Sequence, residues 1–282
     1  MGHDYGARAA SSRPPAISTR DRTVVGIPFG SILELEQLAS DGLAVYLSGS
    51  LAAGNGNSWS DIDVYVIGDR GPLGEFSLDV GTAAASQHYL EGRRIDYEFW
   101  TPNAVAELSS RLNGIRLAEE GTLSLGILSF FEQCFLHRLR IGVPIANSES
   151  FAAIQSRFDF ERLRQYQVQE TLRQLDATLE DLCGMMDAGD IDCGLFTARD
   201  AIGHAIDAYC HSLGNTDPSR KWRTKHLLAV TKPPEDHSQT VETFWQLQFP
   251  NRHEVMHDRQ AGLDYLEQCV RFANRLASWI QR

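Results

Sequence analysis

The spacing of apolar residues divides the chain into two parts. Up to about residue 100 the apolar residues form short runs separated by Gly, Ser and Asn, which predicts strands and loops. The stretch AVYLSGSLAAGNGNSWSDIDVYVIG, residues 44–68, predicts a strand, a turn with a loop, and a second strand. GRRIDYEFWTP, residues 92–102, predicts a further short strand. From about Thr101 the apolar residues recur every three to four positions, which predicts helices in the remainder.

The helical part is interrupted at several points by residues that end helices. The breaks are Gly142-Val-Pro144, Gly189, Gly214–Pro218 and Pro233-Pro234. No repeat of roughly 20 to 50 residues is visible, so the pattern predicts a bundle and not a solenoid. Helices are predicted at Ala104–Leu112, Leu123–Arg140, Phe158–Asp187, Asp190–Ser212, Trp222–Thr231, Gln239–Gln248 and Arg259–Arg282.

The fold class predicted from these patterns is α+β, with a small mixed sheet followed by an all-helical bundle. The 282 residues exceed what one small sheet domain needs, which favours two domains. The first residues are polar and contain prolines, without the apolar segment of a secretory signal. We therefore expect a flexible tail over 1–22, the sheet domain over 23–115 and the helical bundle over 116–282.

Two aspartates one residue apart, Asp61 and Asp63, carry the strongest chemical signal. Side chains of a strand alternate between faces, so both carboxylates lie on one face and Ile62 and Val64 on the other. Two carboxylates this close repel each other unless a cation lies between them. Magnesium, a hard ion that takes oxygen ligands and keeps waters for substrate phosphates, is the expected occupant.

A third acid is available on the next predicted strand. Asp96 and Glu98 share one face of it, and either could complete a metal site. Upstream, the Gly49-Ser50 turn offers backbone N–H groups and a hydroxyl that can hold a triphosphate, because glycine lets the chain approach closely. Together these residues predict a metal-dependent site that handles nucleotide phosphates.

These residues resemble the signature of the nucleotidyltransferase superfamily, which shares the palm-like core of DNA polymerase β. The signature segments here are Leu47-Ser48-Gly49-Ser50, Asp61-Ile62-Asp63-Val64 and Arg94-Ile95-Asp96-Tyr97. Ser48 stands where the family usually has an apolar or aromatic residue. The resemblance implies a nucleotidyltransferase palm in the N-terminal part and contacts from the Gly-Ser pair to the nucleotide's phosphates.

The same resemblance assigns roles to the acids. It implies that Asp61 and Asp63 hold magnesium, and that Asp96 binds a metal and helps to deprotonate the attacking hydroxyl. Glu98 competes with Asp96 for this last role. The implied reaction is attack of an acceptor oxygen on the α-phosphorus of a nucleoside triphosphate, with ATP as the expected donor. Two magnesium ions would neutralise the developing charge while pyrophosphate leaves.

A sheet domain followed by helices resembles antibiotic nucleotidyltransferases, especially aminoglycoside adenylyltransferases. The helix around Asp200 and Asp207, followed by GNTDPSRKWRTKHLL at residues 214–228, resembles their substrate-facing helix and a triphosphate-binding lysine. By that resemblance Lys221 contacts phosphate, and Asp200 or Asp207 contacts an amino group of the acceptor. Alternatively, Lys221 only begins a helix whose Trp222 fills the core.

Charge bears on the acceptor. The net charge is −11 and the isoelectric point about 5.3, without a basic stripe, which argues against a nucleic-acid partner. An acidic surface favours a small cationic acceptor, although solubility alone also accounts for such acidity.

No apolar run approaches the about 20 residues of a membrane span. The sequence is compatible with a homodimer. The cysteines are odd in number and widely spaced, which predicts buried thiols in a cytoplasmic protein: Cys134, Cys183, Cys193, Cys210 and Cys269.

Two further motifs offer rival functions. His253-Glu254-Val255-Met256-His257 matches the HExxH pattern of zinc proteases, with Glu267 as a distant third ligand, but no metzincin continuation follows. We expect its histidines to lie in the helical core instead. Arg199 and His204 resemble the Arg-x4-His signature of HEPN ribonucleases, which would make the chain a fused toxin and antitoxin pair. Within the transferase class, drugs, biosynthetic intermediates and proteins or peptides all stay open as acceptors.

Overall fold

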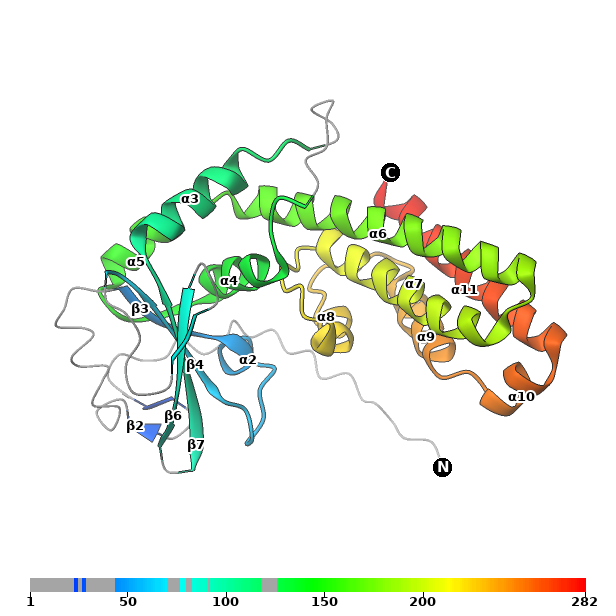
Figure 1. Ribbon diagram of the computed structural model, residues 1–282, viewed down its shortest axis with the longest axis horizontal. Helices are drawn as coiled ribbons and strands as arrows, with labels where there is room; N and C mark the ends of the chain where they lie inside the picture. The colour runs from blue at the N-terminus through cyan, green and yellow to red at the C-terminus, as the bar shows by residue number, and fades with distance from the viewer. Residues whose placement is uncertain are drawn as a thin grey trace. The chain divides into compact units, whose positions relative to one another are not determined.

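The computed structural model describes residues 23–24, 27–28, 44–69, 77–79, 83–90, 92–117 and 126–282. The predicted tail, 1–22, lies outside this range. The chain forms two compact units (Figure 1). Unit 1 comprises 1–106 and 141–156, and unit 2 comprises 107–140 and 157–282. The fold class is α+β, as predicted.

Unit 1 is built on a six-stranded mixed sheet with the order β5-β6-β7-β4-β3-β8. The parallel pair is β4 with β7, and the other neighbours in this sheet are antiparallel. A separate two-stranded sheet pairs β1 (Thr23–Val24) with β2 (Ile27–Pro28). The strands of the larger sheet are β3 (Ala44–Ser48), β4 (Ile62–Ile67), β5 (Ser77–Asp79), β6 (Ala83–Leu90), β7 (Arg93–Trp100) and β8 (Val143–Ala146).

The alternation of β4 and β7 places an apolar cluster on one face of this sheet. Ile62, Val64 and Val66 of β4 are buried there with side chains from β3 and β7. The opposite face buries the stacked rings of Tyr46 and Tyr65, whose centroids lie 5.0 Å apart. Because both faces are covered along most of β4, only its polar N-terminal end is free for a site. The three strands predicted from the sequence are confirmed.

The helix break predicted at Gly142-Val-Pro144 is confirmed, since α4 (Phe130–Ile141) ends there, but the residues after Gly142 form the strand β8. β8 pairs with β3 at the edge of the sheet, and α5 (Ser148–Gln155) follows it. The two units therefore do not follow each other along the chain with one boundary at residue 115, as predicted. The chain enters unit 2 at residue 107, returns to the sheet of unit 1 over 141–156, and then continues in unit 2. Proline is tolerated in an edge strand such as β8, because the outer side of an edge strand does not need the N–H that proline lacks.

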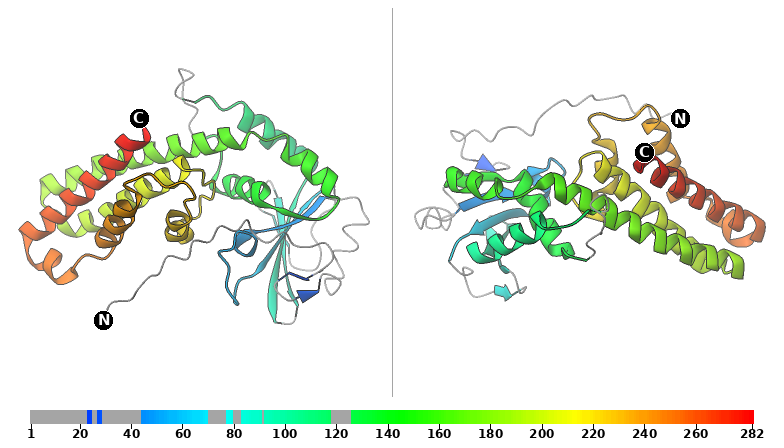
Figure 2. Two further views of the ribbon diagram at one scale, coloured as in Figure 1. Left: turned by 180° about the vertical axis from the view of Figure 1, so that it is seen from behind. Right: turned by 90° about the horizontal axis from the view of Figure 1, so that it is seen from above.

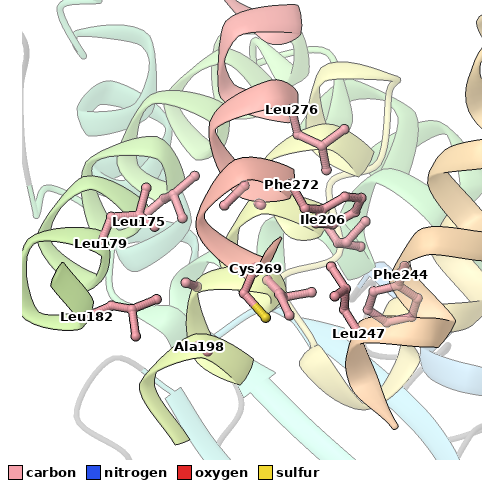
Figure 3. Close-up of a cluster of buried hydrophobic side chains, with 14 of the residues drawn as sticks. Leu175, Leu179, Leu182, Ala198, Ile206, Phe244, Leu247, Cys269, Phe272 and Leu276 are labelled. Carbon is pink, nitrogen blue, oxygen red and sulfur yellow. The ribbon is translucent and has the colours of Figure 1, made fainter. Parts of the chain in front are cut away.

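Unit 2 is dominated by three long helices, α6, α7 and α11, which lie side by side in both views of the molecule (Figure 2). Their facing sides bury leucines and other apolar residues, including Leu175, Ile206 and Phe272 (Figure 3). Besides α2 (Gly49–Ala52) and α5, the residues that the structure describes form the helices α3 (Pro102–Asn113), α4 (Phe130–Ile141), α6 (Phe160–Ala188), α7 (Ile191–Ser212), η3 (Arg220–Trp222), α8 (Arg223–Leu228), α9 (His237–Gln248), α10 (Arg252–His257) and α11 (Arg259–Ile280).

Local signals explain where the long helices begin and end. The side chains of Asp159 and Asp190 accept hydrogen bonds from backbone N–H groups of the first turns of α6 and α7. Gly189 ends α6 in the left-handed conformation, with φ = 69°. The helix predicted to begin at Leu123 begins at Phe130, because residues 126–129 are not helical and 118–125 lie outside the described range. In the described part of the chain no helix is long and apolar enough to span a bilayer.

The prediction that all the cysteines are buried is wrong for two of them. Cys210 and Cys269 are buried in the helical core, whereas Cys183 and Cys193 are exposed and Cys134 is half-buried. Cys193 lies in the first turn of α7, where the helical pattern does not reveal which residues the neighbouring helices cover.

A buried polar network joins α4 to the loop before α8. Nδ1 of His137 lies 3.0 Å from Oγ1 of Thr216, and its Nε2 lies 3.9 Å from Oδ2 of Asp217. The same Asp217 oxygen lies 3.1 Å from Nε2 of His226. Burial lowers the pKa of His137 to about 4, although Asp217 opposes this change. His137 is therefore neutral at pH 7.

This network predicts a fall in stability at mildly acidic pH. The unfolded chain protonates His137 near pH 6.5, whereas the folded protein does so only near pH 4. Between these values the unfolded state binds more protons, so the free energy of unfolding decreases as the pH is lowered. From pH 7 to pH 5 the loss should be about 2 kcal/mol, measured by urea unfolding.

His137→Gln is the matched control, since it keeps a polar group near Thr216 but cannot take up the proton. Its loss of stability between pH 7 and pH 5 should be smaller by about the same 2 kcal/mol. An equal loss in both proteins would show that His137 is not the responsible group.

Candidate active site

The strand pairing of unit 1 aligns the predicted acids. Asp63 of β4 pairs with Asp96 of β7 on one side and with Ser48 of β3 on the other. Neighbouring strands lie about 4.8 Å apart, so Asp63 and Asp96 occupy adjacent positions. Asp61 directly precedes β4 and shares the face of Asp63, because strand side chains alternate. Three of the acids predicted from the sequence therefore occupy neighbouring backbone positions at one end of β4.

The Gly49-Ser50 turn lies against the carboxylate of Asp63. Gly49 has φ = 74°, a left-handed conformation that costs glycine little. A Cβ added there would lie 1.8 Å from Oδ2 and 2.5 Å from Cγ of Asp63. The backbone conformation and the close approach of the carboxylate thus both require glycine at this position.

Ser50 lies in the helical turn α2 that follows β3. The first N–H groups of a helical turn lack partners within it, so this turn offers donors where the sequence predicted phosphate contacts. The carbonyl oxygen of Ser50 accepts hydrogen bonds from the N–H groups of Asn55 at 2.8 Å and Gly56 at 2.7 Å. These bonds fold the following loop back onto α2 and fix the position of the turn beside Asp63.

Arg94 lies between two of the three acids. Its guanidinium donates a hydrogen bond to Oδ2 of Asp61, and its Nε lies 3.0 Å from Oδ1 of Asp96. The hydrogen bond to Asp61 is the main reason that the pKa of Arg94 is raised. The cation that two adjacent carboxylates require is thus supplied, in this structure, by a side chain of the protein.

Asp96 is half-buried, with a side chain that is 27% exposed. Burial raises its pKa, the nearby Asp61 raises it further, and Arg94 opposes both effects. Its Oδ1 is buried and makes no hydrogen bond. In the range that the structure describes, no three His, Cys, Asp or Glu side chains are grouped as metal ligands. Carboxylate oxygens and an unsatisfied buried oxygen nevertheless fit the donor set that magnesium prefers.

Glu98 occupies the next position along the same face of β7. It pairs with Tyr65 of β4 rather than with an acid. Its Oε1 accepts a hydrogen bond from Nε1 of Trp100 at 2.7 Å. Two residues along a strand span about 6.6 Å, so Glu98 is farther from Asp63 than Asp96 is. This register favours Asp96 over Glu98 as the third acid.

In unit 2, Asp200 and Asp207 lie seven residues apart on α7 and so share one helix face. Asp207 is already paired, because its two oxygens accept hydrogen bonds from Nε and Nη2 of Arg223 at 2.7 and 2.6 Å. Asp200 is exposed. Of the two residues predicted to meet the acceptor, Asp200 is thus the more accessible.

Lys221 lies in η3, within a segment of concentrated positive charge. Residues 218–234 contain five Lys or Arg residues and no acid, in a chain of net charge −11. All three lysines of the chain are in this segment, and Lys221 and Lys225 lie over the ring of Trp222, 5.2 and 4.6 Å from its centroid. Trp222 is only half-buried, so it does not fill the core as the alternative supposed.

The residues of the ribonuclease hypothesis do not form a pair. Arg199 and His204 are five residues apart on α7, which separates them by about 140° around the helix. Arg199 is exposed, whereas His204 is buried and burial lowers its pKa. An exposed arginine and a buried histidine on different faces do not make a common RNA site.

The HExxH segment lies in the short helix α10. The rings of His253 and His257 face each other, with centroids 4.8 Å apart. Both histidines are exposed, so the prediction that they lie in the core is wrong. The six residues of α10 end before α11 begins, which leaves both rings outside the packed helices. The proposed third ligand, Glu267, is in an ion pair with Arg271, with a distance of 2.6 Å.

Two side chains near the acids escaped the sequence analysis. The signature segment contains Arg94 but assigns no role to it. Its place two residues before Asp96 nevertheless puts both side chains on the same face of the strand. Trp59, two residues before Asp61, is 95% exposed. The Asn57 side chain fixes this turn by accepting a hydrogen bond from the N–H of Trp59 at 2.9 Å. Alternation along β7 could have revealed Arg94, whereas nothing in the sequence indicates the exposure of Trp59.

Known proteins share features with this chain. No curated protein matches it. Among solved structures, it is similar to a nucleotidyltransferase-like protein from Exiguobacterium sibiricum 255-15, with 11% identity and a TM-score of 0.46, over 89% of this chain and 77% of that one. Residues 31–104 match the family model of the nucleotidyltransferase domain, and this segment contains the Gly-Ser turn and the acids of β4 and β7. The chain thus carries a nucleotidyltransferase domain and is a transferase enzyme.

Proposed function

We propose that the protein transfers a nucleoside monophosphate, with ATP as donor and AMP as the transferred group, to a hydroxyl of a small acceptor. The observation that carries this proposal is the register that places Asp63 between Ser48 at the Gly-Ser turn and Asp96 of β7. The backbone turn that we assign to the phosphates and the carboxylates that we assign to the metal both lie at one end of β4, as nucleotidyl transfer requires.

Each residue of this end of the sheet has a proposed role. Asp61, Asp63 and Asp96 would hold magnesium, which neutralises triphosphate charge and lowers the pKa of the attacking hydroxyl. Gly49 and Ser50 would hold the phosphates through the turn of α2. Asp96 accepts the proton of the acceptor hydroxyl, as the raised pKa of a partly buried carboxylate favours. The new bond joins the acceptor oxygen to the α-phosphorus, and the bond to pyrophosphate breaks.

The acceptor is proposed to be small and cationic, such as an aminoglycoside or a biosynthetic intermediate. The negative net charge supports this choice, because it attracts cations and repels polyphosphate polymers. Asp200 is exposed on α7 and is the carboxylate we assign to an amino group of the acceptor. A protein or peptide hydroxyl would use the same chemistry and is the second candidate.

The first test asks which acids the reaction needs. Asp61→Asn and Asp63→Asn should each reduce magnesium-dependent pyrophosphate release at least about 100-fold, because a metal ligand contributes several kcal/mol to transition-state stabilisation. Release should be measured with ATP, GTP, CTP and UTP across a panel of aminoglycosides and other polyols.

The third acid is decided in the same assay. Asp96→Asn should match the loss in Asp63→Asn, whereas Glu98→Gln should retain most of the activity because its carboxylate bonds Trp100. Greater loss in Glu98→Gln than in Asp96→Asn would reverse this assignment. Activity retained by folded Asp61→Asn and Asp63→Asn would contradict the proposed function.

The close approach of Gly49 to Asp63 gives a second prediction. Gly49→Ala and Gly54→Ala both place a side chain at positive φ, 74° and 72°, and this backbone strain should cost each variant about 1 kcal/mol of stability. Only at Gly49 does the new Cβ meet a carboxylate, since nothing lies within 4 Å at Gly54. Pyrophosphate release should therefore fall at least about tenfold in Gly49→Ala and little in Gly54→Ala. Equal activity in the two variants would show that the Gly49 contact does not position Asp63.

The basic segment gives a third prediction. Lys221→Gln should weaken binding of magnesium-ATP about tenfold, because a charge-assisted contact to phosphate is worth about 1.5 kcal/mol. Lys232→Gln removes the same charge from the same exposed segment and is the control. Titration calorimetry measures both affinities, and the same affinity in the two variants would remove Lys221 from the nucleotide site.

A further inference from the structure

Arg94 lies where the proposed magnesium would meet its ligands. The position is set by strand pairing, because Asp63 pairs with Asp96 and the residues two places earlier on each strand are Asp61 and Arg94. The guanidinium contacts Asp61 and lies 3.0 Å from Asp96. A divalent ion bound between these carboxylates would therefore lie beside a fixed positive charge.

The contact to Asp96 is incomplete. Nε of Arg94 and Oδ1 of Asp96 are both buried, yet their geometry is not that of a hydrogen bond. The side chain of Arg94 is 41% exposed, so its outer part has room to leave the carboxylates. Guanidinium groups bind phosphate oxygens in the same forked geometry that they use for carboxylates. An incoming triphosphate thus offers Arg94 an equivalent partner.

We propose that Arg94 makes metal binding depend on the nucleotide. Without nucleotide, Arg94 neutralises Asp61 and Asp96 and opposes binding of a lone divalent ion. When a metal–nucleotide complex binds, the guanidinium of Arg94 leaves the carboxylates and contacts the phosphates. The metal of the complex then binds the carboxylates in place of Arg94. The inference rests on the proposed function, since it concerns the same nucleotide site.

Coupling of this kind has a directional signature. Removal of Arg94 should strengthen binding of the metal alone, because a competing cation is lost. It should also weaken binding of the metal–nucleotide complex, because a phosphate partner is lost. Loss of structure would weaken both, so opposite changes in the two affinities distinguish the proposed role from a structural one.

The neighbouring Arg93 provides a matched control. It precedes Arg94 on β7, faces the other side of the strand, and donates a hydrogen bond to the carbonyl oxygen of Ser58 at 3.1 Å. Arg93→Gln changes the net charge by the same amount as Arg94→Gln. General charge effects on metal and nucleotide binding should therefore appear equally in both variants.

The experiment measures the affinity of the protein for Mn²⁺ in the absence of nucleotide, from the electron paramagnetic resonance signal of free Mn²⁺. Arg94→Gln should bind Mn²⁺ about tenfold more tightly than wild type, and Arg93→Gln should match wild type within about twofold. Calorimetry with the manganese complex of a non-hydrolysable ATP analogue should show affinity reduced about fivefold in Arg94→Gln only. Arg94→Lys keeps the charge but cannot bridge two carboxylates. Its affinities for Mn²⁺ and for the manganese–nucleotide complex should change in the same directions as those of Arg94→Gln, but by smaller factors.

The outcomes separate the inference from the function on which it rests. Equal Mn²⁺ affinity in wild type and Arg94→Gln, or equal changes in both arginine variants, would overturn the role of Arg94. Adding Asp63→Asn to Arg94→Gln should abolish the tighter Mn²⁺ binding. Tight binding that survives this change would place the metal elsewhere and overturn the inference together with the proposed metal site. Nucleotide binding that is absent from folded wild type would instead contradict the proposed function.

Discussion

The repulsion among three carboxylates is the constraint on which the candidate site depends. Strand pairing places Asp61, Asp63 and Asp96 at one end of β4, where burial raises the pKa of Asp96. A cation among the acids relieves their mutual repulsion. Here Arg94 supplies that cation. The exchange of cations that we propose for Arg94 would keep the charge of these acids balanced.

The sheet provides the rigidity that such a site needs. One face of β4 packs into an apolar cluster, and the other buries the stacked rings of Tyr46 and Tyr65. Both flanking strands contribute directly, since β3 leads into the Gly-Ser turn and β7 carries Asp96 and Arg94. Gly49 then brings the turn against Asp63, so the turn and the acids are positioned by backbone geometry rather than by flexible side chains.

Unit 2 combines a large apolar core with concentrated polar features. Its long helices bury leucine, isoleucine and phenylalanine side chains along their shared sides. The loop and short helices after α7 hold the Asp217 network and all the lysines of the chain. Arg223 pairs with Asp207 of α7 and so attaches this basic segment to the core. Lys221 of this segment is exposed and lies over the ring of Trp222.

The sequence by itself determined the strands β3, β4 and β7, the long helices and the identity of the acids. Alternation put Asp61 and Asp63 on one face, and helix periodicity with Asp and Gly at the ends located the long helices. Local signals sufficed because they depend on neighbours within a few residues. The return of β8 to the sheet, the exposure of Cys193 and the pairing of Asp207 with Arg223 depend on distant parts of the chain. Only the tertiary structure decided these, and it also placed Arg94 between the acids, because the register of β4 with β7 is set by packing across the whole sheet.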